Sequence, residues 1–236
     1  MNERYEATSL KRYARIAGIL YLIIIICAGF AEGGVRSVLI VPGDATATAN
    51  NILSSEGLYR FGFVCDLIAF ISDAAVAILL YALLKPVNKT VALVASTLRI
   101  IAHPAIGSIN LLNHLAPLNI LTNPDFVSAF TVEQLQNLAM QFLTAHYAGY
   151  LIAGAFFGVH CAILGYLLYK SELFPQWLGI FLIVASIGYV IESFGNFLFP
   201  AYKDIYSWIV VIPAVIAELS LCLWLLIKGI RTSRAA

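Results

Sequence analysis

Ionisable and amide side chains recur inside a stretch of the chain that is otherwise strongly apolar. The segment 98–114 is LRIIAHPAIGSINLLNH, in which Arg99, His103, Asn110 and His114 have spacings that place them along one side of a helix. A charge at the centre of a membrane helix costs about 2.5–3.5 kcal/mol on insertion scales. We therefore expect these side chains to face the interior of a helix bundle, where they pair or line a polar cavity.

Further ionisable residues lie at similar depths in other apolar segments. Depth is measured from the Lys or Trp at the cytoplasmic end of each segment, with a rise of about 1.5 Å per residue. This measure predicts a layer near the middle of the membrane, about 15 to 22 Å deep, that contains Asp73, Arg99, His103, His160, Glu192 and Glu218. It also predicts a second layer nearer the outer face, formed by Glu32, Asp66, His114 and His146.

The middle layer holds more carboxylates than cations. Asp73, Glu192 and Glu218 face only Arg99, so at least one carboxylate should be protonated, or paired with a histidine or a metal. Asp73 and Glu218 are the candidate partners of Arg99, and Asp73 is preferred because the tight turn LLKPVNK joins its segment to that of Arg99. Titratable carboxylates beside histidines suit a proton-coupled or cation-handling site. The leading hypothesis is a binding or transport protein with a polar, titratable cavity in the membrane.

Three other functions stay open. Asp73, His103, His160 and Glu218 offer the oxygen and nitrogen ligands of a zinc-dependent membrane hydrolase. His146 and His160, opposite His103 and His114, could instead hold a b-type haem, and a structural or partner-stabilising role needs no ligand at all. The sequence requires no cofactor. It has no nucleophile elbow, P-loop, dinucleotide fingerprint or metalloprotease motif, which disfavours an enzyme and leaves catalytic residues unassigned.

The elements that must position these residues are membrane-spanning helices. The chain has 236 residues, of which 11% are charged, and a mean hydropathy of +0.89. Soluble domains have about 25% charged residues, and a helix needs about 20 apolar residues to cross a bilayer. The sequence predicts an all-α polytopic bundle, a single integral-membrane domain over residues 1–236, with six spans at 14–40, 58–84, 90–121, 145–169, 176–199 and 206–228.

The distribution of Lys and Arg predicts the orientation of the bundle. With a cytoplasmic N-terminus, three basic residues fall on the outer side: Arg36, Arg60 and Lys203. Ten fall on the inner side: Arg4, Lys11, Arg12, Arg15, Lys85, Lys89, Lys170, Lys228, Arg231 and Arg234. Both termini should therefore be cytoplasmic. The lipid bilayer is the expected partner, a homodimer is an open alternative, and a net charge of +1 gives no reason to expect nucleic acid.

Two outer connections contain further signals. Residues 42–57 open with a turn and should form a short surface helix. In TVEQ, Thr131 and Gln134 match a capping box, in which the cap and the residue three positions later exchange hydrogen bonds. We expect a surface helix that begins there and runs into the fourth span.

Several motifs, in order, resemble one known family. They are RIAGILYLI, VPGDATATANNIL, LLKPVNKTVALVASTLRI and FPQWLGIFLIVASIGYVIESF. Together they resemble an uncharacterised bacterial integral-membrane family, the domain of unknown function 4386, over nearly the whole chain. The resemblance implies a multi-helix fold in the bacterial cytoplasmic (inner) membrane. It brings no assigned activity, so it assigns no functional residue.

Overall fold

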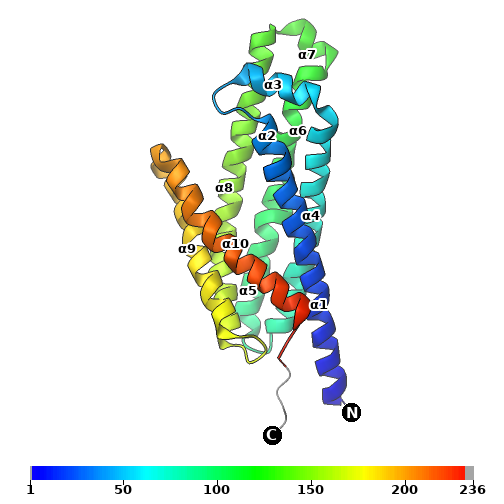
Figure 1. Cartoon of the computed structure of the whole chain (residues 1–236), viewed down its shortest axis with the longest axis vertical. Coiled ribbons are helices and arrows are strands. Elements are labelled where there is room, and N and C mark those ends of the chain that lie inside the picture. The colour runs from blue at the N-terminus through cyan, green and yellow to red at the C-terminus, as the bar shows by residue number, and fades with distance from the viewer. Residues whose placement is uncertain (1, 232–236) are drawn as a thin grey trace. The chain divides into compact units, whose positions relative to one another are not determined.

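The computed structural model describes residues 2–231 and is all-helical over that range (Figure 1). Of the residues counted for the charge bias, Arg234 and the side chain of Arg4 lie outside the described part. Six helical segments are long and apolar enough to cross a membrane, as predicted: Thr8–Leu39, Glu56–Leu84, Lys89–Thr122, Val132–Lys170, Gln176–Leu198 and Pro200–Ile227. The protein is therefore a multi-pass membrane protein.

The chain divides into two compact units, and the boundaries fall inside helices. The first unit contains the residues up to 22, 72–105 and those from 151 onward; the second contains 23–71 and 106–150. Three α-helices contribute to both units: α1 (Asn2–Gly29), α4 (Glu56–Leu84) and α8 (Val132–Lys170). The π-helix η2 (Ile101–Gly107), described below, also contributes to both. Each unit is described separately below.

The first unit also contains four elements of its own: α5 (Lys89–Ile100), α9 (Gln176–Leu198), the 3₁₀ turn η3 (Pro200–Tyr202) and α10 (Lys203–Ile227). Asn88 caps α5 and accepts a hydrogen bond from the backbone N of Val91 at 3.0 Å. Helices α9 and α10 lie side by side (Figure 1). A Cβ added at Gly165 of α8 would lie 2.7 Å from the carbonyl oxygen of Gly179 in α9, so these backbones approach closely because both residues lack side chains.

The second unit contains the shorter helices: α2 (Ser37–Leu39), α3 (Ala45–Ser54), α6 (Ser108–Thr122) and α7 (Pro124–Ala129). The helix predicted within 42–57 is α3, and Asp44 caps it by accepting from the backbone N of Ala47 at 2.8 Å. The capping box is also confirmed. The backbone N of Thr131 donates to Oε1 of Gln134 at 2.9 Å, and the backbone N of Gln134 donates to Oγ1 of Thr131 at 3.3 Å. The helix that it begins, α8, is continuous through the predicted fourth span.

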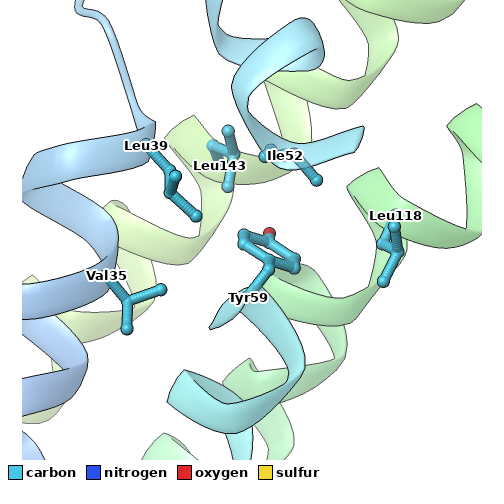
Figure 2. Close-up of a cluster of buried hydrophobic side chains, with 6 residues drawn as sticks. All are labelled: Val35, Leu39, Ile52, Tyr59, Leu118 and Leu143. Atoms are coloured by element: carbon cyan, nitrogen blue, oxygen red, sulfur yellow. The ribbon is translucent and has the colours of Figure 1, made fainter. Parts of the chain in front are cut away.

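A buried apolar cluster holds the second unit together around Tyr59 (Figure 2). Its members come from six different helical segments: Val35, Leu39, Ile52, Tyr59, Leu118 and Leu143. The Tyr59 ring lies among the aliphatic side chains, and its hydroxyl donates to the backbone oxygen of His114. This contact fixes α4 against α6, the helix that supplies two of the predicted polar residues.

Two π-helical segments interrupt the membrane helices: η1 (Phe30–Arg36) and η2 (Ile101–Gly107). η2 contains Pro104, which has no backbone N–H to donate. The regular series of α-helical backbone hydrogen bonds is therefore interrupted at this residue. The residues predicted to form one stripe on segment 98–114 lie on either side of η2 or within it. Arg99 and His103 belong to the first unit, and Asn110 and His114 to the second.

Candidate functional site

The centre of the first unit is an ion pair between Arg99 of α5 and Asp73 of α4. Nη2 of Arg99 lies 2.5 Å from Oδ1 of Asp73, and Nε donates to the same oxygen at 2.8 Å. Each side chain is only 1% exposed. The preferred partner of Arg99 is thus confirmed, and the charge that the sequence placed deep in the membrane is paired.

Two histidines extend this ion pair, and their hydrogen bonds define their roles. Nδ1 of His103 lies 3.2 Å from Oδ2 of Asp73. Nδ1 of His160 lies 2.7 Å from the carbonyl oxygen of Ala95, to which it must donate. Nε2 of His160 then has a lone pair that accepts from Nη1 of Arg99 at 3.2 Å. His160 is therefore a neutral acceptor for Arg99, whereas His103 is a second donor to Asp73.

Aromatic rings surround the guanidinium. Cζ of Arg99 lies 4.8 Å from the ring centre of Tyr21 and 5.2 Å from that of Phe157. The Phe157 ring also lies 4.5 Å from the ring of His103 and 5.4 Å from that of His160. Cation–π contacts of this kind are strongest in desolvated surroundings. We call Tyr21, Asp73, Arg99, His103, Phe157 and His160 the Arg99 cluster.

The two other predicted carboxylates take different positions in the first unit. Glu218 of α10 accepts a hydrogen bond from the hydroxyl of Tyr189, whose ring lies 5.1 Å from that of Phe157. Glu218 thus lies next to the Arg99 cluster, but a phenol is its partner. Glu192 is not brought into the cluster: its backbone oxygen accepts from Nδ2 of Asn196 at 2.8 Å. Of the six residues predicted to share a layer, four contact one another directly: Asp73, Arg99, His103 and His160.

A small cavity lies beside the cluster. His160, Ser96 and apolar residues of α4, α5 and α8 line a volume of about 10 Å³. A single water molecule needs about 10–15 Å³ on this measure. The cavity therefore has room for about one water, and it does not hold a larger solute.

The four residues predicted for the outer layer all lie in the second unit: Glu32, Asp66, His114 and His146. Arg36, which was counted among the basic residues of the outer side, lies with them. Nη1 of Arg36 lies 2.5 Å from Oδ2 of Asp66, and Nε lies 2.7 Å from Oε2 of Glu32. Arg36 is 7% exposed, and its Cζ lies 5.4 Å from the ring centre of Tyr150. Its burial could have been suspected, because Asp66 lies within a span and needs a cation, and Glu32 precedes Arg36 by one helical turn.

The histidines of the second unit are held by backbone carbonyls. Nε2 of His114 lies 3.3 Å from the oxygen of Tyr59, on whose ring the imidazole stacks at 4.2 Å. Nδ1 of His146 lies 3.0 Å from the oxygen of Asn110, whose Nδ2 donates to the oxygen of His146 at 2.7 Å. The two imidazole centres are 5.4 Å apart. We call Glu32, Arg36, Asp66, His114, His146 and Tyr150 the Arg36 cluster.

Comparison with known proteins places this architecture in a family. The sequence profile described as "Domain of unknown function (DUF4386)" matches residues 16–229. The chain belongs to this family. An uncharacterized protein of Archaeoglobus fulgidus is 29% identical to the DUF4386 chain over 174 residues, which cover 73% of this chain and 86% of the relative. No solved structure matches the chain.

The DUF4386 structure also bears on the metal and haem hypotheses. Among residues 2–231, no group of three or more His, Cys, Asp or Glu side chains is arranged to hold a metal ion. Of the four zinc candidates, His160 uses both ring nitrogens within the Arg99 cluster. The haem hypothesis pairs His160 with His103, and the same two hydrogen bonds leave His160 no free ring nitrogen for an iron. The geometry therefore supplies no support for either cofactor in the Arg99 cluster.

Proposed function

We propose that this DUF4386 protein is a proton-linked binding or transport protein for a small cation, in the cytoplasmic membrane of its cell, and that the Arg99 cluster is its site. One observation carries the proposal. The two oxygens of the buried Asp73 carboxylate are divided between Arg99, which stays protonated, and His103, which can gain or lose a proton.

The exposures of the three residues support a path for the proton. Asp73 and Arg99 are each 1% exposed, whereas 24% of the His103 side chain is exposed. The part of the His103 side chain that the protein does not cover is the route by which we propose that a proton reaches the cluster. When His103 is charged, the negative charge of Asp73 is shared between two cations, His103 and Arg99. When His103 is neutral, Arg99 is the cation that pairs with Asp73. The charge balance of a desolvated ion pair thus depends on one accessible imidazole.

The size of the neighbouring space favours a small ligand. The cavity beside His160 holds about one water molecule, which suits a proton or a small cation and not an organic solute. Glu218, hydrogen-bonded by Tyr189, is a further carboxylate of the same unit that can balance a cation. These features support handling of a cation over recognition of a bulky substrate.

The test uses the full chain in proteoliposomes that contain a pH-sensitive dye, challenged with sodium, potassium, ammonium, magnesium and small amines. Wild-type vesicles should move protons when at least one cation is added. Asp73→Asn should abolish this movement. His103→Asn keeps an N–H donor toward Asp73 but cannot take up the proton, so it should uncouple proton movement while the cation still raises the melting temperature.

The control for these variants is Glu172→Gln, which removes an exposed carboxylate beyond the end of α8 and should behave as wild type. Proton movement that persists in both Asp73→Asn and His103→Asn would overturn the proposal. So would wild-type vesicles that move no protons with any cation of the panel.

We further propose that both termini lie in the cytoplasm, on the basis of the ten-to-three distribution of basic residues. A reporter that is active only outside the cytoplasm should stay inactive when fused after Ala236. The same reporter inserted in the connection at 42–57 should be active. The reverse pattern would show that the bundle is oriented the other way.

A further inference from the structure

Two buried imidazole nitrogens in the second unit have lone pairs that no described residue satisfies. His114 donates through Nε2 to the oxygen of Tyr59, so its Nδ1 is the unprotonated nitrogen. His146 donates through Nδ1 to the oxygen of Asn110, so its Nε2 is the unprotonated nitrogen. Both nitrogens are buried without a hydrogen-bond partner, and the residues are 0% and 3% exposed. An unsatisfied buried polar atom costs about 1–3 kcal/mol.

The donors near these histidines are committed elsewhere. The Tyr59 hydroxyl donates to the backbone oxygen of His114, and Nδ2 of Asn110 donates to that of His146. Nδ2 of Asn113 donates to Oδ1 of Asn110 at 3.0 Å. The Arg36 guanidinium donates to Asp66 and Glu32. The tautomers of both histidines are thus fixed by backbone carbonyls. The neighbouring donors bind other acceptors than Nδ1 of His114 and Nε2 of His146.

We propose that His114 Nδ1 and His146 Nε2 form a two-histidine site for copper(I). Neutral imidazole is a good ligand for copper. Zinc sites use three or four protein ligands, whereas no group of three His, Cys, Asp or Glu side chains is arranged for a metal among the described residues. Copper(I) accepts low coordination numbers, so two imidazoles suffice for it.

The charges and geometry of the Arg36 cluster suit a monovalent cation. Two carboxylates, Asp66 and Glu32, face one guanidinium, which leaves one surplus negative charge when both are ionised. A single positive charge at the histidines balances it. The imidazole centres lie 5.4 Å apart, so one ion bonded to both free nitrogens at about 2.0–2.1 Å would join the two rings in a bent arrangement.

The test uses the full chain, purified in detergent, stripped with a chelator and titrated anaerobically with copper(I) against a colorimetric competitor. Wild-type protein should retain a single copper ion and no magnesium. His114→Gln keeps a donor at the Nε2 position, and His146→Asn keeps one at the Nδ1 position, so each removes only the free nitrogen. Each should weaken copper binding by roughly 100-fold, since changes to outer-shell groups alone cost about 10–100-fold.

Thiols are the rival copper ligands, so Cys27→Ser and Cys65→Ser in the same unit are the matched controls. Both variants should bind copper as wild type does, and X-ray absorption of the copper-loaded protein should show nitrogen and no sulfur neighbours. Copper lost in the cysteine variants but kept in the histidine variants would overturn the proposal. So would a wild-type protein that holds zinc in preference to copper, or no copper at all. None of these results depends on proton movement at the Arg99 cluster.

Discussion

The Arg99 cluster and the Arg36 cluster are built from the same kinds of residue but differ in what they leave unpaired. Each has a buried arginine, an aspartate of α4 at 2.5 Å, two histidines and a tyrosine under the guanidinium. Arg99 has one carboxylate partner and an acceptor histidine, whereas Arg36 has two carboxylates and no histidine partner. The first arrangement depends on a single aspartate; the second has a spare carboxylate and two free imidazole nitrogens.

The two clusters differ in how many of their polar atoms have a partner. In the Arg99 cluster nearly every polar atom is used by another, so removing one leaves a buried group uncompensated. In the Arg36 cluster Glu32 is 67% exposed and can keep Arg36 solvated or paired. We expect the first cluster to be sensitive to substitution and the second to tolerate it.

The largest effect is expected from Arg99→Leu, which leaves Asp73 as a buried carboxylate without its arginine. Removing one partner of a buried ion pair costs about 3–5 kcal/mol. The free energy of unfolding in detergent should fall by about this amount, and the double variant Arg99→Leu with Asp73→Asn should recover most of it. A double variant no more stable than Arg99→Leu alone would show that Asp73 is not the energetic partner.

A direct comparison of the two aspartates should give a smaller but clear difference. Asp73→Asn leaves Arg99 without a carboxylate contact and should cost about 3 kcal/mol or more. Asp66→Asn leaves Arg36 paired with Glu32 at 2.7 Å and should cost about 1–3 kcal/mol. Thermal unfolding of the two variants, measured together, tests the order. Equal losses would mean that Glu32 does not compensate.

The smallest effects are expected at the histidines. His160→Asn keeps the donor to Ala95 but removes the acceptor of Arg99, and should cost about 1–3 kcal/mol. His146→Asn, measured without metal, removes only an unpartnered nitrogen and should cost less than about 1 kcal/mol. A greater loss for His146→Asn than for His160→Asn would contradict the view that the Arg99 cluster is the complete one.

The sequence predicted the parts of this structure that depend on local pattern. The six spans follow from hydropathy, the start of α8 follows from Thr131 and Gln134, and the Arg99–Asp73 pair follows from depth and from the tight turn between α4 and α5. Each rests on composition, periodicity or neighbouring segments of the chain.

Other parts depend on tertiary packing, which sequence patterns do not show. Arg36 was assigned to the outer charges because it lies near the end of a span, yet it is buried against Asp66 and Tyr150. Glu192 was predicted to share the depth of the other polar groups, but it lies on a part of α9 that the cluster does not include. The tautomers of His114 and His146 are set by carbonyls 55 and 36 residues away in the chain.

The π-helical segment η2 gives the third span one residue more than a regular α-helix would place between its ends. Deleting a single residue from 101–107 would therefore close this bulge and leave the later residues of the helix close to their present orientation about its axis. In a regular α-helix, by contrast, a deletion turns all later residues by about 100°. Substitutions at the exposed Ala105 should be accepted, and a deletion at the same position should also keep Asn110 and His114 near their partners.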